Sequence, residues 1–590
     1  MQNRRLLLLA ASAVLLGLAR AHGDEAGKME MGGMGDHAAD APKIDAGPPS
    51  YFRHTEHAGL MYAHIAIMTL GWTVVLPIGV VFSVARSRYT LPAQLVFLLF
   101  NAFGLLCSIV YNQKVPNLYE NNAHHKSGWT FILISAAWVL MGLVNLYTGR
   151  EKSLFKGHPV SIDGLARYQR LQEAQSPTTE RRWSGDSGQG TERNSGSLLS
   201  HSRSPSVESE NQQLGEAMPA YAGEPEEEDV EDVEKRGFLR HTRVDRFLSR
   251  NVRRFAFGRT VQVVRIVYAV LDRFMLILGF VAITTGAPVY GGVFRGNAVF
   301  SGLAHFIKGG IFFWYGLLTF GRWMGSFADL GWAWNRKPTE AIVGRWKARM
   351  PSAEFTESFL LALYGASNVF LEHLAAWGEE WSAQDLEHVS ITLMFFGGGV
   401  LGMLIESKSI RSFLSTNIIL AKDQDPAAKD KDWEEPEQYR FPMNPVPGLV
   451  IMLLGIMMSS HHQLSMVSTM LHSQWGTMFV GCALARGVTY LTLYLSPPSS
   501  YLPSRPPSEI IASFCLVGGG LIFMMSNTDT VESLEYNNLD AMFVFTVTMG
   551  VACLLLAWTT IVLALKGWAV RREQRSGMPV SATPTFLQQA

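Results

Sequence analysis

Eleven long apolar runs follow one another along this chain, and they decide what it can fold into. They cover residues 58–84, 91–111, 127–148, 263–286, 299–321, 355–377, 389–406, 445–460, 474–495, 509–526 and 541–566. Most approach the roughly 20 residues that an α-helix needs to cross about 30 Å of hydrocarbon. We therefore predict an all-α, polytopic membrane protein with about eleven transmembrane helices.

The composition agrees with this class and excludes others. Of the 590 residues, 48% are hydrophobic and only 17% are charged, whereas soluble proteins carry roughly a quarter charged residues. A formal net charge of zero argues against a nucleic-acid binder that relies on overall positive charge. The four cysteines are too few for a disulfide scaffold. The lipid bilayer is therefore the expected partner, and nucleic acid is not.

The first residues are typical of a targeting signal. Arg4 and Arg5 precede an apolar run from Leu6 to Leu18, and Ala19-Arg20-Ala21 supplies a small-x-small cleavage pattern. A run this short does not span a bilayer and indicates a cleaved signal peptide over residues 1–21. The mature N-terminus is then expected in a lumenal or extracellular compartment.

The distribution of charge gives the orientation of the helices. Alternating loops, including the one that begins with Arg322, are rich in Lys and Arg, which the positive-inside rule assigns to the cytoplasm. The predicted lumenal segments carry 16 acidic and six basic residues; they are 22–57, 112–127, 287–298, 378–388, 461–473 and 527–540. We expect a lumenal N-terminus, a cytoplasmic C-terminus, and residence in the endomembrane system or the plasma membrane. The acidic lumenal face should attract metal cations.

The chain divides into six segments on these criteria. The segment after residue 149 is rich in Ser, Gly and Glu and is expected to be disordered, with a basic amphipathic helix or a stop-transfer charge cluster at its end. The predicted organisation is a signal peptide (1–21), a lumenal tail with Met and His (22–57), a three-helix membrane domain (58–149), a cytoplasmic loop (150–260), an eight-helix membrane domain (261–567) and a cytoplasmic tail (568–590).

Histidines provide the main chemical signal. Of 16 histidines, all but His158, His201 and His241 fall in predicted lumenal segments or in the lumenal half of a helix. Histidine is the commonest metal ligand, and ionisable residues within a membrane are functional candidates. Metal or haem binding on the lumenal side is therefore expected.

In the first membrane domain, His64 lies in the first helix and His125 opens the third, both at lumenal depth. The motif residues near them are Gly71-Trp72, Leu76-Pro77-x-Gly79, Arg86 and Gly128. Residues 64–286 resemble the transmembrane core of the cytochrome b-561/ferric reductase family, which carries electrons across membranes on haems held by histidine pairs. The resemblance implies one b-haem bound by His64 and His125. The second pair is unmatched, because Gln94 and Asp272 occupy the corresponding helix starts.

The second membrane domain has its own cluster of candidate ligands at lumenal helix ends. The candidates are His305, Glu372, His373, His388, His461, His462 and His472. Nitrogen and oxygen ligands of this kind suit Zn, Cu or Fe ions. The alternative is that these residues only cap helices and form interhelical hydrogen bonds.

Two basic residues are predicted inside the bilayer, where each needs a partner. Glu357 and Glu406 are candidate partners for Arg486, and His305 is one for Lys308.

Three segments carry a resemblance that extends along nearly the whole chain. They are Ala63–Gly79, His388–Gly397 and Met457–Gly476, and they are similar to the fungal YTP (yeast putative transmembrane protein) family. The C-terminal part, around His305–Phe313 and His388, also resembles the animal TMEM forty-five group. Both resemblances imply membrane location and architecture, and neither implies an activity.

Three functions remain open at this point. The first is redox or metal chemistry, with one lumenal b-haem and a metal ion in the C-terminal cluster. The second is a zinc-dependent intramembrane lipid hydrolase, with Glu372 or Asp529 as general base. The third is a non-catalytic membrane organiser.

Overall fold

The computed structural model describes residues 49–155, 258–368, 381–421, 436, 438, 441–461 and 463–575. Within these ranges the regular structure is helical, without strands, so the predicted all-α class is confirmed for the described part of the chain. Of the described residues, those up to 142 and those from 266 onward belong to one compact unit. The predicted signal peptide, most of the N-terminal tail and most of the long loop lie outside the described residues.

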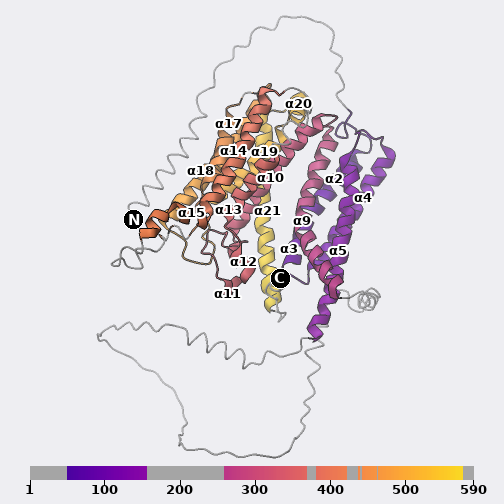
Figure 1. Cartoon of the computed structure of the whole chain (residues 1–590). Helices are drawn as coiled ribbons and strands as arrows, with labels where there is room; N and C mark the ends of the chain where they lie inside the picture. Colours follow the sequence, from indigo (N-terminus) through magenta and orange to yellow (C-terminus); the bar gives the residue numbers. More distant parts are fainter. Residues whose placement is uncertain are drawn as a thin grey trace, which may run out of the picture. The chain divides into compact units, whose positions relative to one another are not determined.

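The helix that follows the long loop packs against the helices of the first membrane domain. The elements are α2 (Ala58–Leu70), the π-helical turn η1 (Gly71–Val75), α3 (Leu76–Val84), α4 (Thr90–Lys114), α5 (Ala123–Phe155) and α9 (Gly258–Gly291). Polar side chains connect α9 to the other helices: Trp138 Nε1 donates to Asp272 Oδ1 (3.1 Å), and Gln94 Nε2 donates to the Tyr268 hydroxyl (3.0 Å). Figure 1 shows these elements side by side, in indigo to magenta.

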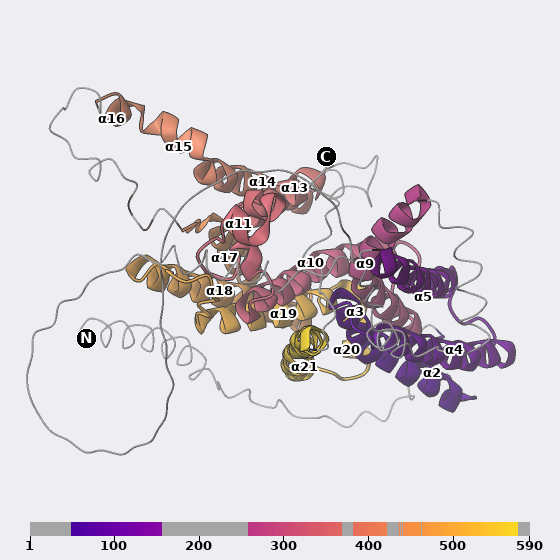
Figure 2. The ribbon, with the colours of Figure 1, turned by 90° about the horizontal axis from the view of Figure 1, so that it is seen from below.

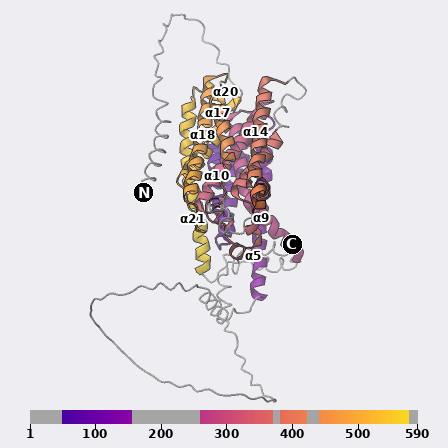
Figure 3. The same ribbon diagram turned by 60° about the vertical axis from the view of Figure 1, so that its left-hand side comes forward.

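Seven longer helices belong to the second membrane domain within the described ranges. They are α10 (Ala298–Met324), α13 (Ala353–Asn368), α14 (Ala383–Glu406), α17 (Val446–Ser459), α18 (Met466–Leu495), α19 (Ser508–Met525) and α21 (Ala541–Arg575). Figures 1 and 3 show several of them running alongside one another. Short helices occupy the connections: η2 (Ala328–Leu330), α11 (Glu340–Val343), α12 (Arg345–Arg349), α15 (Lys408–Leu414), α16 (Thr416–Ala421) and α20 (Thr528–Tyr536).

Nine of the predicted spans are helices long and apolar enough to cross a membrane, among the residues that the structure describes. A tenth, α17, is apolar but has only 14 residues. The remaining one begins as α13, and the residues after Asn368 lie outside the described ranges. The predicted count of eleven is therefore not confirmed, whereas a polytopic helical membrane protein is.

Glycines bring three helix pairs into backbone contact. A Cβ atom added to Gly520 of α19 would lie 2.6 Å from the backbone nitrogen of Phe313 in α10. A Cβ atom on Gly399 of α14 would collide with the backbone nitrogen of Ala362 in α13. On Gly455 of α17 it would lie 2.6 Å from a carbonyl oxygen of α18. Small residues at such positions are the usual means by which helices pack closely in lipid.

The last helix, α21, contacts both membrane domains and so connects them. Pro77 has no N–H to offer the carbonyl oxygen of Thr73, four residues earlier, and Trp558 Nε1 donates to that oxygen instead, at 2.9 Å. At one end of α21, Glu573 accepts two hydrogen bonds from the Arg88 guanidinium, which raise the pKa of Arg88. Figure 2 shows α21 beside α3 and α19. This helix continues well beyond its predicted end at residue 566.

Loops predicted for the same side of the membrane meet one another. Tyr119, before α5, donates to the carbonyl oxygen of Val293, before α10, at 2.6 Å. The backbone nitrogen of Phe294 in turn donates to Asp529 of α20 at 2.7 Å. These three loops were all predicted to be lumenal. These contacts between the three loops agree with the predicted alternation of the membrane crossings. Which end of the helices faces the lumen stays a prediction.

Candidate functional site

The first candidate site is a pair of histidines, His64 of α2 and His124 of α5. Their ring centroids lie 6.4 Å apart with an interplanar angle of 71°. The Nδ1 atom of His64 lies 2.8 Å from the carbonyl oxygen of Gly104. A carbonyl oxygen only accepts, so Nδ1 must carry the proton. The Nε2 atom of a neutral His64 ring is therefore left with a free lone pair.

His124 is held in a similar way. Its Nδ1 atom lies 3.2 Å from Thr285 Oγ1, and that hydroxyl donates its own proton to the carbonyl oxygen of Val281 at 2.8 Å. The Thr285 oxygen can therefore accept from His124 Nδ1. Beside the ring is Gly286, where a Cβ atom would approach the His124 Cε1 atom to 3.2 Å. The glycine thus leaves the space that the imidazole fills.

The b-561 resemblance implies a pair of His64 and His125, whereas the structure places His124 beside His64. His125 is exposed, and its Nδ1 atom lies 3.4 Å from Asn112 Nδ2. Gln94 and Asp272, which stand where the b-561 resemblance would have a second histidine pair, are both buried and hydrogen-bonded to aromatic side chains of this domain.

The second candidate site pairs His305 of α10 with His472 of α18. Their ring centroids are also 6.4 Å apart, at an interplanar angle of 90°. Each Nδ1 atom lies close to the carbonyl oxygen one turn earlier, at 2.9 Å for His305 and 2.8 Å for His472. By the same reasoning both neutral rings keep a free Nε2 lone pair. Phe523 packs edge-on against the His305 ring, and Trp475 lies next to His472.

The structure describes only some of the other predicted metal ligands. His388 of α14 is close enough to His305, and His461 close enough to His472, to interact electrostatically. Glu372, His373 and His462 lie outside the described residues. Among the residues that are described, no three His, Cys, Asp or Glu side chains gather closely enough to hold a metal ion by themselves.

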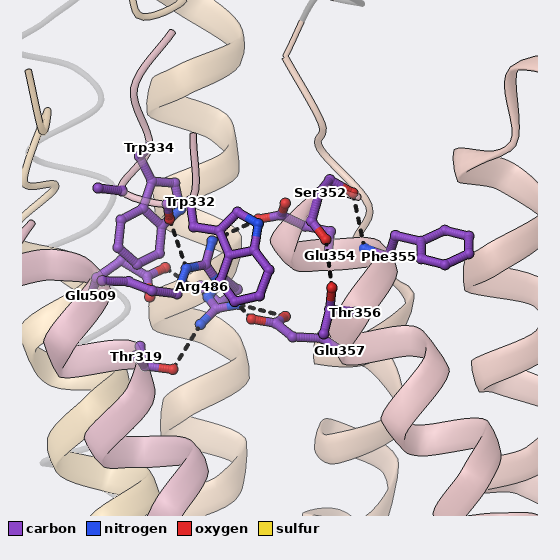
Figure 4. Close-up of polar contacts among 12 residues, drawn as sticks. Thr319, Trp332, Trp334, Ser352, Glu354, Phe355, Thr356, Glu357, Arg486 and Glu509 are labelled. Carbon is purple, nitrogen blue, oxygen red and sulfur yellow. Dashed lines mark hydrogen bonds and ion pairs between the residues drawn. The ribbon is translucent and has the colours of Figure 1, made fainter. Parts of the chain in front are cut away.

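A third polar site lies at the opposite end of α10 and α18, and we term it the ionic network. It consists of two arginines and three glutamates from four helices, Arg322 of α10, Glu354 and Glu357 of α13, Arg486 of α18 and Glu509 of α19. None of the five is more than 6% exposed. Figure 4 shows this site with the surrounding loops.

Glu357 is the centre of the network, because both arginines bind it. Arg322 Nη1 donates to one of its carboxylate oxygens at 2.5 Å, and Arg486 Nη1 donates to the other at 3.2 Å. Arg322 also donates from Nη2 to Glu354 at 2.9 Å. Trp334 covers the Arg322 guanidinium, with 4.3 Å from Cζ to the ring centroid. Such charge-assisted bonds are strong, and desolvation makes them costly to break.

The contact of Arg486 with Glu509 differs from the others. Arg486 Nε lies 2.7 Å from Glu509 Oε1, an ion-pair distance. The direction of the N–H is nevertheless not that of a hydrogen bond, and neither oxygen of Glu509 has a hydrogen-bond partner among the described residues. Glu509 is fully buried.

The sequence identified part of this network. The predicted pairing of Arg486 with Glu357 is confirmed, whereas Glu406 receives a hydrogen bond from Ser352 instead. Arg322 was assigned to a cytoplasmic loop and was missed. The available signal was the pair of glutamates three residues apart at the start of α13, which in a helix face the same side.

Comparison with known proteins agrees with the architecture. Residues 278–567 match the family model "Protein YTP1-like, C-terminal", and residues 45–148 match a domain of unknown function, DUF2427. An uncharacterized membrane protein of Schizosaccharomyces pombe is 32% identical over 92% of this chain and 100% of its own length. An uncharacterized membrane protein of Saccharomyces cerevisiae is 35% identical over 53% of this chain and 50% of its own.

Protein YTP1 of Saccharomyces cerevisiae is 26% identical over 30% of this chain and 31% of its own length. No solved structure matches. The b-561 and TMEM forty-five resemblances have no counterpart among these matches. Because one relative is matched along its whole length, and both family models fall on the two membrane domains, this chain is an integral membrane protein that belongs to the YTP1-like family.

Proposed function

We propose that this membrane protein binds a b-haem between His64 and His124. The observation that carries the proposal is the close pair of imidazoles, with ring centroids 6.4 Å apart and each Nδ1 atom beside an oxygen atom. His64 and His124 would hold the haem iron through their imidazole nitrogens, as histidines do in other haem proteins.

The chemistry of the surroundings also suits an axially held haem. Hydrogen bonds from Nδ1 fix the tautomer and the orientation of a ligating histidine and raise its basicity. The two imidazoles would be the protein's ligands to the haem, so a third His, Cys, Asp or Glu side chain would not be required. Bound haem would supply one-electron redox chemistry. The likeness of residues 64–286 to the b-561 core supports this choice over a bare metal ion.

An absorption spectrum of the full-length protein, purified in detergent, tests the proposal. A Soret band in the wild type should disappear in His64→Ala and in His124→Ala and should persist in His125→Ala. The neighbouring histidine is a matched control, because it is exposed on the same helix turn. A wild type without a Soret band refutes the proposal. Loss of the band in His64→Ala and His125→Ala, with its persistence in His124→Ala, would favour the pairing implied by the b-561 resemblance.

A second candidate is a bound metal ion at His305 and His472. The specific support is the same ligand-ready tautomer in both rings, with His388 close to His305. Metal analysis of the purified protein should find less metal in His472→Ala than in His125→Ala. Zinc without iron would instead favour the lipid hydrolase, with Asp529 or Glu372 as base. The absence of both metal and haem would favour a membrane organiser.

A further inference from the structure

A short helical segment, residues 408–421, follows directly on the membrane-spanning helix α14. Ser407 has an extended backbone conformation that ends α14, and its side chain caps α15 by accepting a hydrogen bond from the backbone nitrogen of Ile410. Helical hydrogen bonds continue from α15 into α16, because Ile419 N donates to the carbonyl oxygen of Ser415 at 3.0 Å. Figure 2 shows α15 and α16 extending away from α14. We term residues 408–421 the α15–α16 arm.

The apolar side chains of the arm are almost uncovered. The four highest exposures, between 64% and 81%, belong to Phe413, Leu414, Ile418 and Leu420. At about 100° per residue these four lie on one side of the helix, whereas Lys408, Ser412 and Ser415 lie on the other. Asn417 and Ile419 are the exceptions to this pattern. The arm is too short to cross a bilayer, which takes about 20 residues, so it is an amphipathic surface element.

The position of the arm indicates that lipid covers its apolar side. α14 is long and apolar enough to cross a membrane, and Leu401, Leu404 and Ile405 near its end are exposed. The lipid-facing surface of α14 therefore continues into the arm. α15 itself contacts chiefly α14 and α16. An amphipathic helix that begins where a spanning helix ends lies in the membrane interface, with its apolar side among the acyl chains.

The charges at the start of the arm favour anionic lipid. Lys408 is exposed and close enough to Lys337 to interact with it electrostatically, so the two form a basic pair. Arg411 interacts in the same way with Glu406 and is therefore not counted as free for lipid. The orientation predicted from the sequence places both segments in the cytoplasm, where the membrane leaflet carries anionic lipids.

We propose that the α15–α16 arm is a membrane-surface anchor that binds the anionic lipid interface of the bilayer that this protein spans. Phe413, Leu414 and Ile418 insert among the acyl chains. Lys408 and Lys337 contact the phosphate groups of anionic lipids. The anchor fixes the end of α14 at the membrane surface, and it does not depend on the proposed haem.

Fluorescence quenching in the full-length protein, reconstituted in vesicles of phosphatidylcholine and phosphatidylserine, tests this proposal. Cys107 and Cys553, the two cysteines that are not buried, are replaced by alanine, and the polarity-sensitive fluorophore NBD is attached at Ile418→Cys. The matched control is Ser412→Cys, an exposed position on the polar side of the same arm. We expect a quencher on the lipid acyl chains to reduce the fluorescence at residue 418, and iodide in the water to reduce it at residue 412.

Two further variants keep the test decisive. Leu414→Cys places a second probe on the apolar side and should behave like Ile418→Cys. Replacing phosphatidylserine by phosphatidylcholine should shift the emission at residue 418 to longer wavelength, and Lys408→Gln should abolish this shift. Equal access of iodide to residues 412 and 418 would overturn the proposal. Protection of residue 418 from both quenchers would also overturn it, because protein rather than lipid would then cover the arm. Emission that does not change with phosphatidylserine would refute the preference for anionic lipid.

Discussion

Replacement of Glu357 by glutamine should destabilise the protein strongly, because this carboxylate is bound by both arginines of the ionic network. Glutamine keeps one acceptor oxygen, but its amide nitrogen would face the second guanidinium. Removing one partner of a buried ion pair costs about 3–5 kcal/mol, since the charge left behind stays desolvated. At about 2–4 °C per kcal/mol for domains of this size class, the melting temperature should fall by roughly 6–20 °C.

Glu340→Gln is the matched control. Glu340 also pairs with an arginine, Arg345, at 3.2 Å, but the two side chains are 57% and 67% exposed. Exposed ion pairs contribute about 0–1 kcal/mol, so this variant should melt within a few degrees of the wild type. Thermal unfolding of both variants in one detergent, followed by size-exclusion chromatography, gives the comparison. Equal shifts in the two variants would refute the reasoning that burial decides the cost.

The remaining predictions concern the contacts between helices. Gly520→Ala should cost about 1–3 kcal/mol, because its Cβ would meet backbone atoms of α10. Gly550→Ala, where a Cβ would meet nothing within 4 Å, should stabilise the protein by about 0.5–1 kcal/mol; thermal melts showing the same sign for both would contradict this. Trp558→Phe should cost about 1–3 kcal/mol by leaving the Thr73 carbonyl unbonded. The loss should be smaller with Pro77→Ala, which restores a backbone donor, as a double-mutant cycle can measure.

Much of the fold could be predicted because few backbone conformations are stable in lipid. A backbone in hydrocarbon must satisfy its own hydrogen bonds, so apolar length alone located spans such as Ala58–Val84 and Asp385–Glu406. The same rule fails for short elements. The amphipathic helix α20 lies in a segment that was predicted only as a loop, because nine residues that are not apolar give no hydropathy signal.

The sequence could not predict which residues meet between two helices, because that depends on how each helix is rotated about its own axis. Adjacent residues on a helix point about 100° apart, so His124 and His125 cannot both face His64. The residue that faces inward is decided by α9, whose Thr285 and Gly286 receive the His124 ring. These residues lie far along the chain, beyond the long loop, and no spacing pattern connects them to the histidine.

Electrostatic pairing was predictable only where a charge was recognised as buried. Arg486 stands well inside an apolar run, so a glutamate partner was required, and Glu357 is that partner. Arg322 was read as part of a positive cytoplasmic loop. It is in fact in the last turn of α10 and is 1% exposed. A charge at a helix end satisfies the positive-inside rule whether or not it is buried, and the rule cannot tell the two cases apart.

The same helices, α10 and α18, carry the second histidine pair at one end and the ionic network at the other. On α10, His305 and Arg322 are separated by about 25 Å along the axis, at a rise of about 1.5 Å per residue. The space between is filled by apolar side chains. The ring centroids of Phe312 and Phe479 lie 4.2 Å apart at an interplanar angle of 40°, and Leu516 is fully buried. Glycine contacts hold α10 against α19 through this region. The metal ion proposed at His305 and His472 would therefore lie at one end of these helices, and the ionic network joins the helices near the other.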